Sequence, residues 1–439
     1  MAAARAGARQ HRKVALVQDG RVGGDCTFTG CVPSKTLIES AAAPSDFAAA
    51  MRRVHEVIER IAVTESAQVL RGEGIDVIEG RARFVGARSI EVSGRRIDAP
   101  RFVVATGSSP FVPPIAGLPE VAYLTNETVW RLHNQPASMT IIGGGAVGCE
   151  LAQAFARFGV RVAIVEAADR LLAKEEPQAS AVVADVFKRD GIEVRLAAKA
   201  VRAAQHEGGT RVELDDGAIL DAEQLLIAVG RIPSTAALDA GAAGIRLDGK
   251  GYVVTDARLR TSANGVYAVG DVTGKMPFTH AADEMGRIAA INALRAPLLR
   301  FHPEDTPWVT FTTPEVARVG MTEEQAAAHG GKVAFLPMTE VDRAITASAT
   351  DGFVKLIAGP RMLSRNAGGG RLLGATIVAP RAGEMIHEIA LAMRARAFTG
   401  RLAQTVHAYP TWSTAVRSAA ALFFVDVNGR RATPAKREH

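Results

Sequence analysis

The stretch Gly23-Gly24-Asp25-Cys26-Thr27-Phe28-Thr29-Gly30-Cys31-Val32-Pro33-Ser34-Lys35 sets the chemistry expected of this chain. It holds two of the three cysteines among 439 residues. The residues after it predict the first turns of a helix. Cys31 is therefore expected near a helix N-terminus, where amide groups and the helix dipole favour a thiolate. A dithiol placed this way can open and close a disulfide, although a structural disulfide or a chance pair fits the bare spacing equally well.

Length and composition are those of a multidomain globular protein. A chain of 439 residues predicts two to four domains, and 48% of the residues are hydrophobic. No apolar run approaches the roughly 18 residues of a membrane span, so no membrane partner is expected. The segment from Met1 to Gly7 lacks the apolar core of a secretory signal, which favours a cytoplasmic location. Three cysteines in so long a chain do not form a secreted disulfide scaffold.

The charge of the chain argues against nucleic acid as a partner. The formal net charge is +6, but the basic residues are scattered among acidic ones. Neither a dense basic patch nor a nucleic-acid-binding motif is present.

A complete dinucleotide-binding unit is predicted in the middle of the chain. Residues 138–142 predict a strand and residues 149–158 a helix, with a G-x-G-x-x-G turn between them. The three glycines of the turn are Gly143, Gly145 and Gly148. Glu166 ends the next strand, where a carboxylate can bind a ribose hydroxyl and repel a 2′-phosphate. The sequence thus predicts NAD in preference to NADP; the alternative is a glycine-rich loop without a ligand.

The string from Gly23 to Lys35 resembles the active-site signature of the class I pyridine nucleotide-disulfide oxidoreductases. This family includes dihydrolipoamide dehydrogenase, glutathione reductase and mercuric reductase. The resemblance covers nearly the whole chain. It implies an α/β fold with two Rossmann-like dinucleotide-binding domains, for FAD and NAD, and a C-terminal α+β dimerisation domain, hence a homodimer. It also implies that electrons pass from the nicotinamide cofactor through FAD to a Cys26–Cys31 disulfide, with Cys31 as the flavin-side thiolate and Cys26 as the thiol that meets the substrate.

The N-terminal flavin unit can be compared with the second unit by register. Residues 2–8 predict a helix and residues 13–18 a buried parallel strand that resembles residues 161–166. Alignment of Lys13 with Arg161 places the counterpart of Gly143 18 residues before Lys13, ahead of Met1. The first strand and phosphate-binding turn are therefore expected to be missing from this sequence, either because translation starts upstream or because the flavin domain is damaged.

Other flavin contacts follow from the resemblance. Residues 102–107 predict a buried strand, and residues 261–271 match the late flavin motif, whose final carboxylate faces the ribityl hydroxyls. Gln18 stands where the family commonly has a Glu for the adenosine ribose. The flavin and nicotinamide contacts expected besides these are Gly24, Thr106, Gly107, Gly230, Gly270 and Asp271.

Domain boundaries and the remaining elements are also predicted. The expected domains are 1–115 (FAD, first part), 116–234 (NAD(P)), 235–302 (FAD, return segment), 303–428 (dimerisation) and 429–439 (tail). The expected elements are a helix over 47–69, short strands over 75–97, antiparallel strands from residue 303, helices over 383–397 and 412–422, and a disordered tail from residue 430.

Two further groups of residues complete the predicted catalytic set. Lys35 is expected beside the flavin, paired with Glu150 of the nicotinamide unit, because a buried lysine needs a carboxylate. Disulfide-reducing relatives carry a His–Glu dyad, contributed across the dimer, in the C-terminal motif. Here Tyr409 and Thr414 hold those positions. His407 lies two residues upstream, on the same face of an extended segment but without its Glu.

The electron acceptor stays open at this point. A phenol is a poor base at neutral pH, so efficient lipoamide turnover is not expected. A tyrosine here resembles mercuric reductase, yet no cysteine follows Cys149, which is expected to be buried packing. The acceptor is a metal ion or a small molecule such as a disulfide, a quinone or oxygen, and no resident metal site is predicted. The rival interpretations are a dihydrolipoamide dehydrogenase and a flavin-free, inactive nicotinamide-binding dimer.

Overall fold

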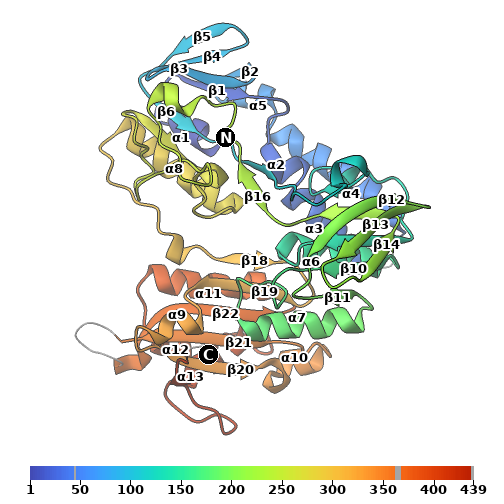
Figure 1. The fold of residues 1–439 in the computed structure, drawn as a ribbon. Coiled ribbons are helices and arrows are strands. Elements are labelled where there is room, and N and C mark those ends of the chain that lie inside the picture. The colour runs from blue at the N-terminus through green and yellow to red at the C-terminus, as the bar shows by residue number, and fades with distance from the viewer. Residues whose placement is uncertain (44–45, 361–366, 437–439) are drawn as a thin grey trace. The chain divides into compact units, whose positions relative to one another are not determined.

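The computed structural model describes residues 1–43, 46–360 and 367–436 (Figure 1). The fold is α/β, as predicted, and the chain forms two compact units. The first contains Met1–Pro113, Leu124–Gln135 and Ile227–Pro303. The second contains Pro114–Tyr123, Pro136–Leu226 and Glu304–His439.

Two pairs of parallel strands position the site in the first unit. Strand β1 (Val14–Gln18) pairs with β2 (Ile75–Glu79), and β6 (Phe102–Val104) pairs with β17 (Val266–Ala268). The predicted strand at residues 13–18 is thus confirmed in place and direction. Its predicted burial is wrong: Ala15 is exposed and the rest is half-buried. Within the described residues β1 has only β2 as a sheet neighbour, which leaves its other edge uncovered.

The two cysteines of the motif lie on consecutive short helices. Helix α2 (Gly24–Phe28) carries Cys26, and α3 (Cys31–Ala41) begins at Cys31 itself. The predicted place of Cys31 near a helix N-terminus is confirmed, but the helix begins within the motif and not after Lys35. Gly30 joins the helices where space is tight, because a Cβ atom there would lie 3.0 Å from the carbonyl oxygen of Asp25. A small residue at this junction lets the two cysteines approach each other.

The long helix predicted over residues 47–69 is two helices. Helix α4 (Phe47–Thr64) ends before Ser66, and α5 (Ala67–Gly72) begins after it. The Ser66 hydroxyl accepts a hydrogen bond from the Val69 amide at 3.3 Å, so it caps α5 and favours a new helix start over continuation. Three apolar residues at helical spacing on α4, Met51, Val54 and Ile58, are buried.

The first unit contains two further sets of elements that match the prediction. The short strands are β3 (Ala82–Gly86), β4 (Ser89–Val92) and β5 (Arg95–Asp98), which form an antiparallel meander. Helix α8 (Thr279–Leu294) follows the late flavin motif, and α1 (Ala2–Ala8) packs against it. Strands β7 (Ser108–Pro110) and β16 (Arg231–Pro233) pair antiparallel.

The nicotinamide part of the second unit has the predicted parallel sheet. Its strands lie in the order β11-β10-β9-β15. Their bounds are Glu193–Arg195, Arg161–Val165, Ser138–Ile142 and Gln224–Ile227. Helix α6 (Ala146–Arg157) follows the glycine turn directly, and α7 (Pro177–Arg189) follows β10. A second meander contains β12 (Ala200–His206), β13 (Gly209–Leu214) and β14 (Ile219–Ala222).

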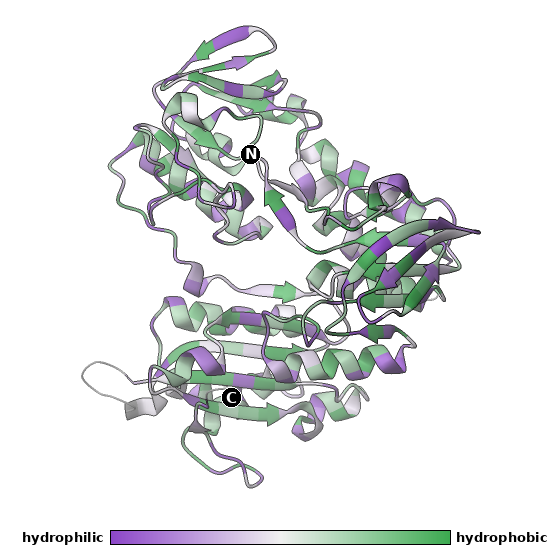
Figure 2. Cartoon of the chain, in the orientation of Figure 1, coloured by the Kyte–Doolittle hydropathy of each residue, from purple (hydrophilic) through white to green (hydrophobic). Residues whose placement is uncertain are grey.

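The C-terminal part is a six-stranded antiparallel sheet in the order β18-β19-β22-β21-β20-β23, as predicted for residues after 303. Helix α11 (Ala382–Arg394) covers β19 and β22, and Figure 2 shows the apolar residues that line these strands. The strand bounds are Trp308–Thr310, Glu315–Gly320, Arg371–Ala379, Phe353–Gly359, Lys332–Pro337 and Thr433–Pro434. The shorter helices are α9 (Glu323–Ala327), α10 (Asp342–Thr346), α12 (Thr399–Gln404) and α13 (Thr414–Ala421).

The prediction of a disordered tail is wrong over residues 430–436. Strand β23 pairs with the edge strand β20, with Thr433 opposite Val333. The edge of a sheet offers unpaired backbone groups, and a short polar segment can satisfy them. Residues 437–439 lie outside the described residues.

A buried charge cluster joins the two parts of the second unit. The Lys355 side chain is 1% exposed, and its Nζ lies 3.0 Å from Glu176 and 2.8 Å from Glu323. Gln178 accepts a third hydrogen bond at 2.9 Å. All three ammonium protons of Lys355 therefore have acceptors, which offsets the cost of burying the charge.

We expect Lys355→Met to lower the free energy of unfolding by roughly 3–5 kcal/mol, because two carboxylates then lose their cation in a dry site. The matched control is Asp351→Asn, which breaks the half-exposed pair with Arg189 and should cost less than about 1 kcal/mol. Urea unfolding of the full chain measures both changes. Equal losses in the two variants would contradict the assignment of Lys355 as a buried structural cation.

Candidate active site

The two motif cysteines form a hydrogen-bonded thiol pair. They are not joined as a disulfide, and the pKa of the Cys26 thiol is raised, first by its hydrogen bond to Cys31 and then by burial. The Sγ atom of Cys31 also lies 3.5 Å from the Oγ1 of Thr279. Cys31 stands at the start of α3, where free amides and the helix dipole favour the charge of a singly deprotonated pair.

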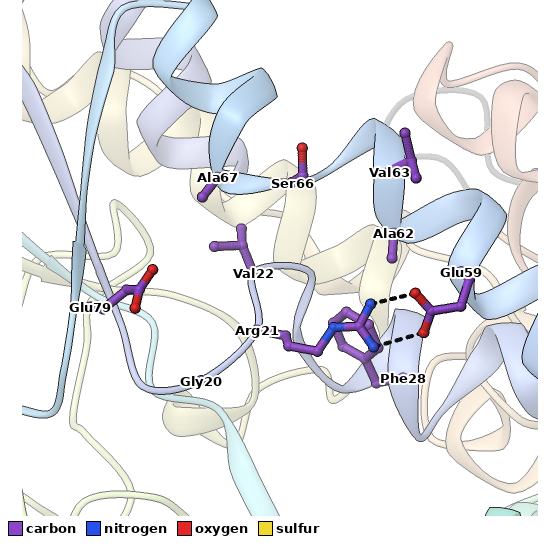
Figure 3. Close-up of a pocket in the computed structure, with 10 residues that line it drawn as sticks. All are labelled: Gly20, Arg21, Val22, Phe28, Glu59, Ala62, Val63, Ser66, Ala67 and Glu79. Atoms are coloured by element: carbon purple, nitrogen blue, oxygen red, sulfur yellow. Dashed lines mark hydrogen bonds and ion pairs between the residues drawn. The ribbon is translucent and has the colours of Figure 1, made fainter.

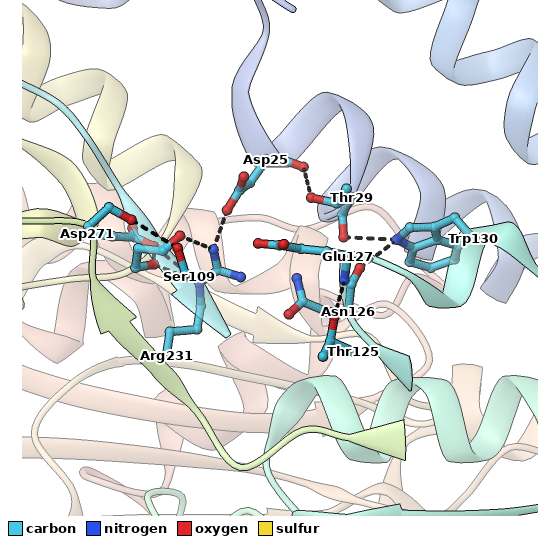
Figure 4. A network of polar contacts seen from close by, with 11 residues as sticks. Asp25, Thr29, Ser109, Thr125, Asn126, Glu127, Trp130, Arg231 and Asp271 are labelled. Carbon is cyan, nitrogen blue, oxygen red and sulfur yellow. Dashed lines mark hydrogen bonds and ion pairs between the residues drawn. The ribbon is translucent and has the colours of Figure 1, made fainter. Parts of the chain in front are cut away.

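An arginine links the cysteine-bearing helix to the end of β17 (Figure 4). The guanidinium of Arg231 donates to the carboxylate of Asp25, the residue before Cys26. Its Nε donates to the Ser108 hydroxyl at 2.6 Å, and that hydroxyl donates to Asp271 at 2.6 Å. One side chain therefore holds together segments that lie 206 residues apart in the sequence.

Two more side chains shape this network. The indole Nε1 of Trp130 donates to the carbonyl oxygens of Thr29, at 3.1 Å, and Asn126, at 2.7 Å. This contact holds the α2–α3 junction in place. Burial raises the pKa of Glu127, and the negative charge of Asp25 raises it further. The surroundings of the cysteine helix are thus anionic, with Arg231 as the compensating cation.

The residues expected to contact FAD fit a bound group. Strands β6 and β17 are parallel neighbours, so Thr106-Gly107 and Gly270-Asp271 follow them at one sheet edge. Gly24, Gly107 and Gly230 have φ values of +71°, +72° and +135°, and a Cβ atom on any of them would meet nothing within 4 Å. Open space beside glycine backbone is what close approach of a cofactor requires.

A pocket of about 470 Å³ lies beyond the carboxyl ends of β1 and β2 (Figure 3). Glu79 ends β2, and Gly20 follows Gln18, the last residue of β1. Arg21 forms a bidentate pair with Glu59 at 2.8 Å and lies 4.4 Å from the ring centroid of Phe28. The volume is within the range of small-molecule sites, so the pocket can hold part of a dinucleotide.

The nicotinamide turn has the geometry that its sequence predicts. A Cβ atom on Gly148 would lie 1.9 Å from the Gly143 carbonyl oxygen, so only glycine lets α6 pack this closely. Gly145 has open space around it. The Glu166 carboxylate accepts the amides of Gly144, at 2.6 Å, and Ala168, at 2.8 Å. These bonds fix the carboxylate beside the turn, where it can meet a ribose.

Lys35 and Glu150 lie in different units, and their pairing stays a prediction. Lys35 is half-buried on α3, one turn after Cys31. Glu150 is buried on α6 and accepts the Phe311 amide at 2.8 Å.

The C-terminal motif differs from expectation in two ways. His407 does have a carboxylate: its Nε2 lies 2.9 Å from Glu388 of α11, and its Nδ1 lies 3.0 Å from the Thr405 carbonyl oxygen. The side chain is only 7% exposed, whereas Tyr409 is 71% exposed and bonds to Asp342. The two residues therefore do not share one environment. The carboxylate beside His407 comes from α11, while Thr414 holds the motif position of the missing Glu.

Several residues of these networks were missed by sequence reasoning. Arg231 stands in the linker motif after Gly230, and Asp25 stands between Gly24 and Cys26, so both lie in motifs that signal a site. Glu388 and Asp342 carry no such signal, because each meets its partner only through the fold.

The described residues contain neither a metal-binding cluster nor a membrane-spanning helix. No group of three or more His, Cys, Asp or Glu side chains is arranged to hold a metal ion. No helix among these residues is both long enough and apolar enough to span a bilayer.

A dinucleotide turn and a thiol pair at a helix start define a nucleotide-dependent dithiol oxidoreductase. Comparison with known families agrees with this class. Residues 1–286 match the model of the pyridine nucleotide-disulphide oxidoreductases, and residues 306–420 match the dimerisation domain of the same proteins. The chain belongs to the pyridine nucleotide-disulphide oxidoreductase family, an enzyme family that uses FAD and a nicotinamide cofactor.

Relatives of several activities resemble this chain over most of its length. A mercuric reductase of Bacillus cereus is 33% identical over 95% of this chain and 68% of its own. A dihydrolipoyl dehydrogenase of Thermus scotoductus is 33% identical over 94% of this chain and 93% of its own. The solved flavoprotein disulfide reductase RclA of Escherichia coli superposes with a TM-score of 0.87 at 32% identity, covering 96% of both chains; it is also known as a Cu(II) complex.

We expect two glycine variants of the nicotinamide turn to separate stability from binding. In Gly148→Ala, the added methyl group overlaps the Gly143 carbonyl oxygen and pushes α6 away from the turn. This change should lower the free energy of unfolding by roughly 1–3 kcal/mol. Gly145→Ala has room for its methyl group and should change stability by less than about 1 kcal/mol, yet weaken NADH binding, because the methyl group occupies the space beside the turn. Thermal unfolding and a titration of NADH fluorescence measure the two effects. Unchanged NADH affinity in Gly145→Ala would contradict this cofactor site.

Proposed function

We propose that this enzyme transfers two electrons from NADH to a thiophilic metal ion, with mercuric ion as the best candidate, through FAD and the Cys26–Cys31 pair. The observation that carries the proposal is the hydrogen-bonded thiol pair at the start of α3. Two adjacent sulfur atoms can bind one soft cation, which they prefer to hard ones. The mercuric reductases among the relatives, and the Cu(II) complex of RclA, support a metal ion as the acceptor.

The residues of the first unit would have separate roles in binding FAD and in the reaction. FAD, when bound, supplies the two-electron transfer between the nicotinamide cofactor and the cysteines. Asp271 and the glycines at 24, 107, 230 and 270 would hold its flavin and ribityl parts. Gln18 and the pocket beyond β1 and β2 would hold its adenosine part. Lys35, paired with Glu150, would place a positive charge beside the flavin. Cys26 would receive the acceptor, and Cys31 would hold the thiolate.

A metal ion suits this chain better than a dithiol substrate does. Lipoamide exchange needs a base that is neutral near pH 7 and reaches the substrate. The Tyr409 phenol is exposed, but Asp342 raises its pKa above the ordinary value near 10. His407 is buried, with both ring nitrogens bonded. A mercuric ion takes both electrons without needing a proton, so its reduction does not require a base at this motif.

The cellular setting completes the proposal. A working dithiol suits a reducing compartment, which favours the cytoplasm. The match to the dimerisation domain supports a homodimer.

We expect Cys26→Ser and Cys31→Ser each to lower mercuric-ion-dependent NADH oxidation by at least about a hundredfold, because one sulfur atom cannot complete a dithiol cycle. Cys149→Ser is the matched control: this thiol is buried and bonds to the Gly144 carbonyl oxygen at 3.3 Å, so the rate should stay within about threefold. The rate at which NADH absorbance falls after addition of mercuric ion measures the activity of all three variants. Full activity in both motif variants would overturn the proposal in favour of direct reduction of the acceptor by the flavin.

We expect Glu166→Gln to reduce the preference for NADH over NADPH by about five- to tenfold. A carboxylate close to the 2′-phosphate repels it by on the order of 1 kcal/mol, and the amide keeps the size of the side chain without its charge. The ratio of kcat/KM for the two cofactors measures the effect. A wild-type enzyme that prefers NADPH would contradict the assignment of Glu166.

A further inference from the structure

Tyr409 is exposed, yet its side chain is fixed in one direction. Within its own chain the ring is 71% exposed, so little packing from that chain chooses its rotamer. Its hydroxyl donates to the Oδ2 of Asp342 at 2.8 Å. A hydrogen bond to an ionised acceptor is stronger than one between neutral groups, so this contact decides where the phenol points.

A second contact joins the same two segments. Arg343, which follows Asp342 on α10, lies 5.6 Å from the ring centroid of Trp412, and Trp412 lies three residues after Tyr409. Two consecutive residues of α10 thus hold two aromatic residues of the C-terminal motif. The cation over the indole restricts the backbone of the motif, and the carboxylate then restricts the phenol.

The other end of the motif is also held. His407 bonds to Glu388 of α11 and to the Thr405 carbonyl oxygen. The Thr414 hydroxyl accepts the Thr411 amide at 3.3 Å. The segment that carries Tyr409 is therefore fixed on both sides, and only the phenol itself depends on Asp342.

The charges that line the small pocket beside Tyr409 are Glu340, Asp342 and Arg343. Glu340 is engaged elsewhere, because it accepts Arg430 at 2.7 Å. Asp342 is thus the carboxylate that acts on the phenol, and it raises the pKa of Tyr409, since a phenolate beside a carboxylate is disfavoured.

We infer that Asp342 is the positioning residue for Tyr409: it accepts the phenol proton and thereby aims the oxygen of the neutral phenol while the acceptor is handled. The inference rests on the proposed function for the part that Tyr409 plays. It assigns a role to a residue of α10 that belongs to none of the motifs. Because its one proton is donated to Asp342, Tyr409 then presents the lone pairs of its oxygen to the acceptor, and it does not serve as a base.

A spectroscopic titration tests the positioning without any turnover. The chain has four tyrosines, so the absorbance difference between wild type and Tyr409→Phe isolates the phenolate signal of Tyr409. Asp342→Asn should shift that titration to lower pH, toward the ordinary value near 10. Glu340→Gln is the matched control, with the same loss of charge in the same pocket, and should leave the curve in place. Circular dichroism verifies that each variant stays folded. An unmoved curve in Asp342→Asn would overturn the inference.

A double-mutant cycle tests the link to turnover. Asp342→Asn should slow mercuric-ion-dependent NADH oxidation by about tenfold in wild type and by less than twofold in Tyr409→Phe, because the carboxylate acts through the phenol. An equal loss in both backgrounds would overturn the inference. If Tyr409→Phe alone leaves turnover unchanged, the proposed part of Tyr409 is wrong, and the titration still decides whether Asp342 positions it.

Discussion

The site of the first unit depends on the guanidinium of Arg231. It lies between Asp25, Ser108 and, through that hydroxyl, Asp271, so it compensates two carboxylates with one cation. Arginine suits this position because its planar fork donates in several directions at once and stays charged at any physiological pH. Without it, two carboxylates would face each other beside a thiol pair that itself must carry negative charge. The ion pair of Asp25 with Arg231 therefore helps to hold the helix with Cys26 in place.

The second unit prepares its ligand site in a different way. The carboxylate of Glu166 is already bonded to two backbone amides, and Gly148 leaves no room for a side chain. Little rearrangement is then needed when a nucleotide binds, which lowers the ordering cost of binding. The hydrogen bonds of Lys355 connect the start of α7 to the antiparallel sheet, so the part of the unit that carries the nucleotide turn is held rigidly.

Sequence reasoning succeeded where the signal is local. The glycine turn, the helix start at Cys31 and the strand ends before Thr106 and Gly270 each depend on residues within one short stretch. The break at Ser66 was missed because the apolar stripe of α4 has the period of a continuing helix, while the cap acts through a single hydroxyl. Glu388 and Asp342 lie 19 and 67 residues before their partners in the chain. No periodicity links such pairs, and the same holds for the strand pairing of the tail.

The first unit is assembled from three separate stretches of chain, and this bears on its synthesis. Its cysteines leave the ribosome well before Asp271, which completes their network and comes 240 residues after Cys31. At 5–20 residues per second, that interval lasts about 10 to 50 seconds. For most of it, the nascent thiols stand without Arg231, which comes 200 residues after Cys31. The period of greatest vulnerability to stray metal ions and oxidants therefore falls before the enzyme is finished, when the only protection is that of the surrounding cell.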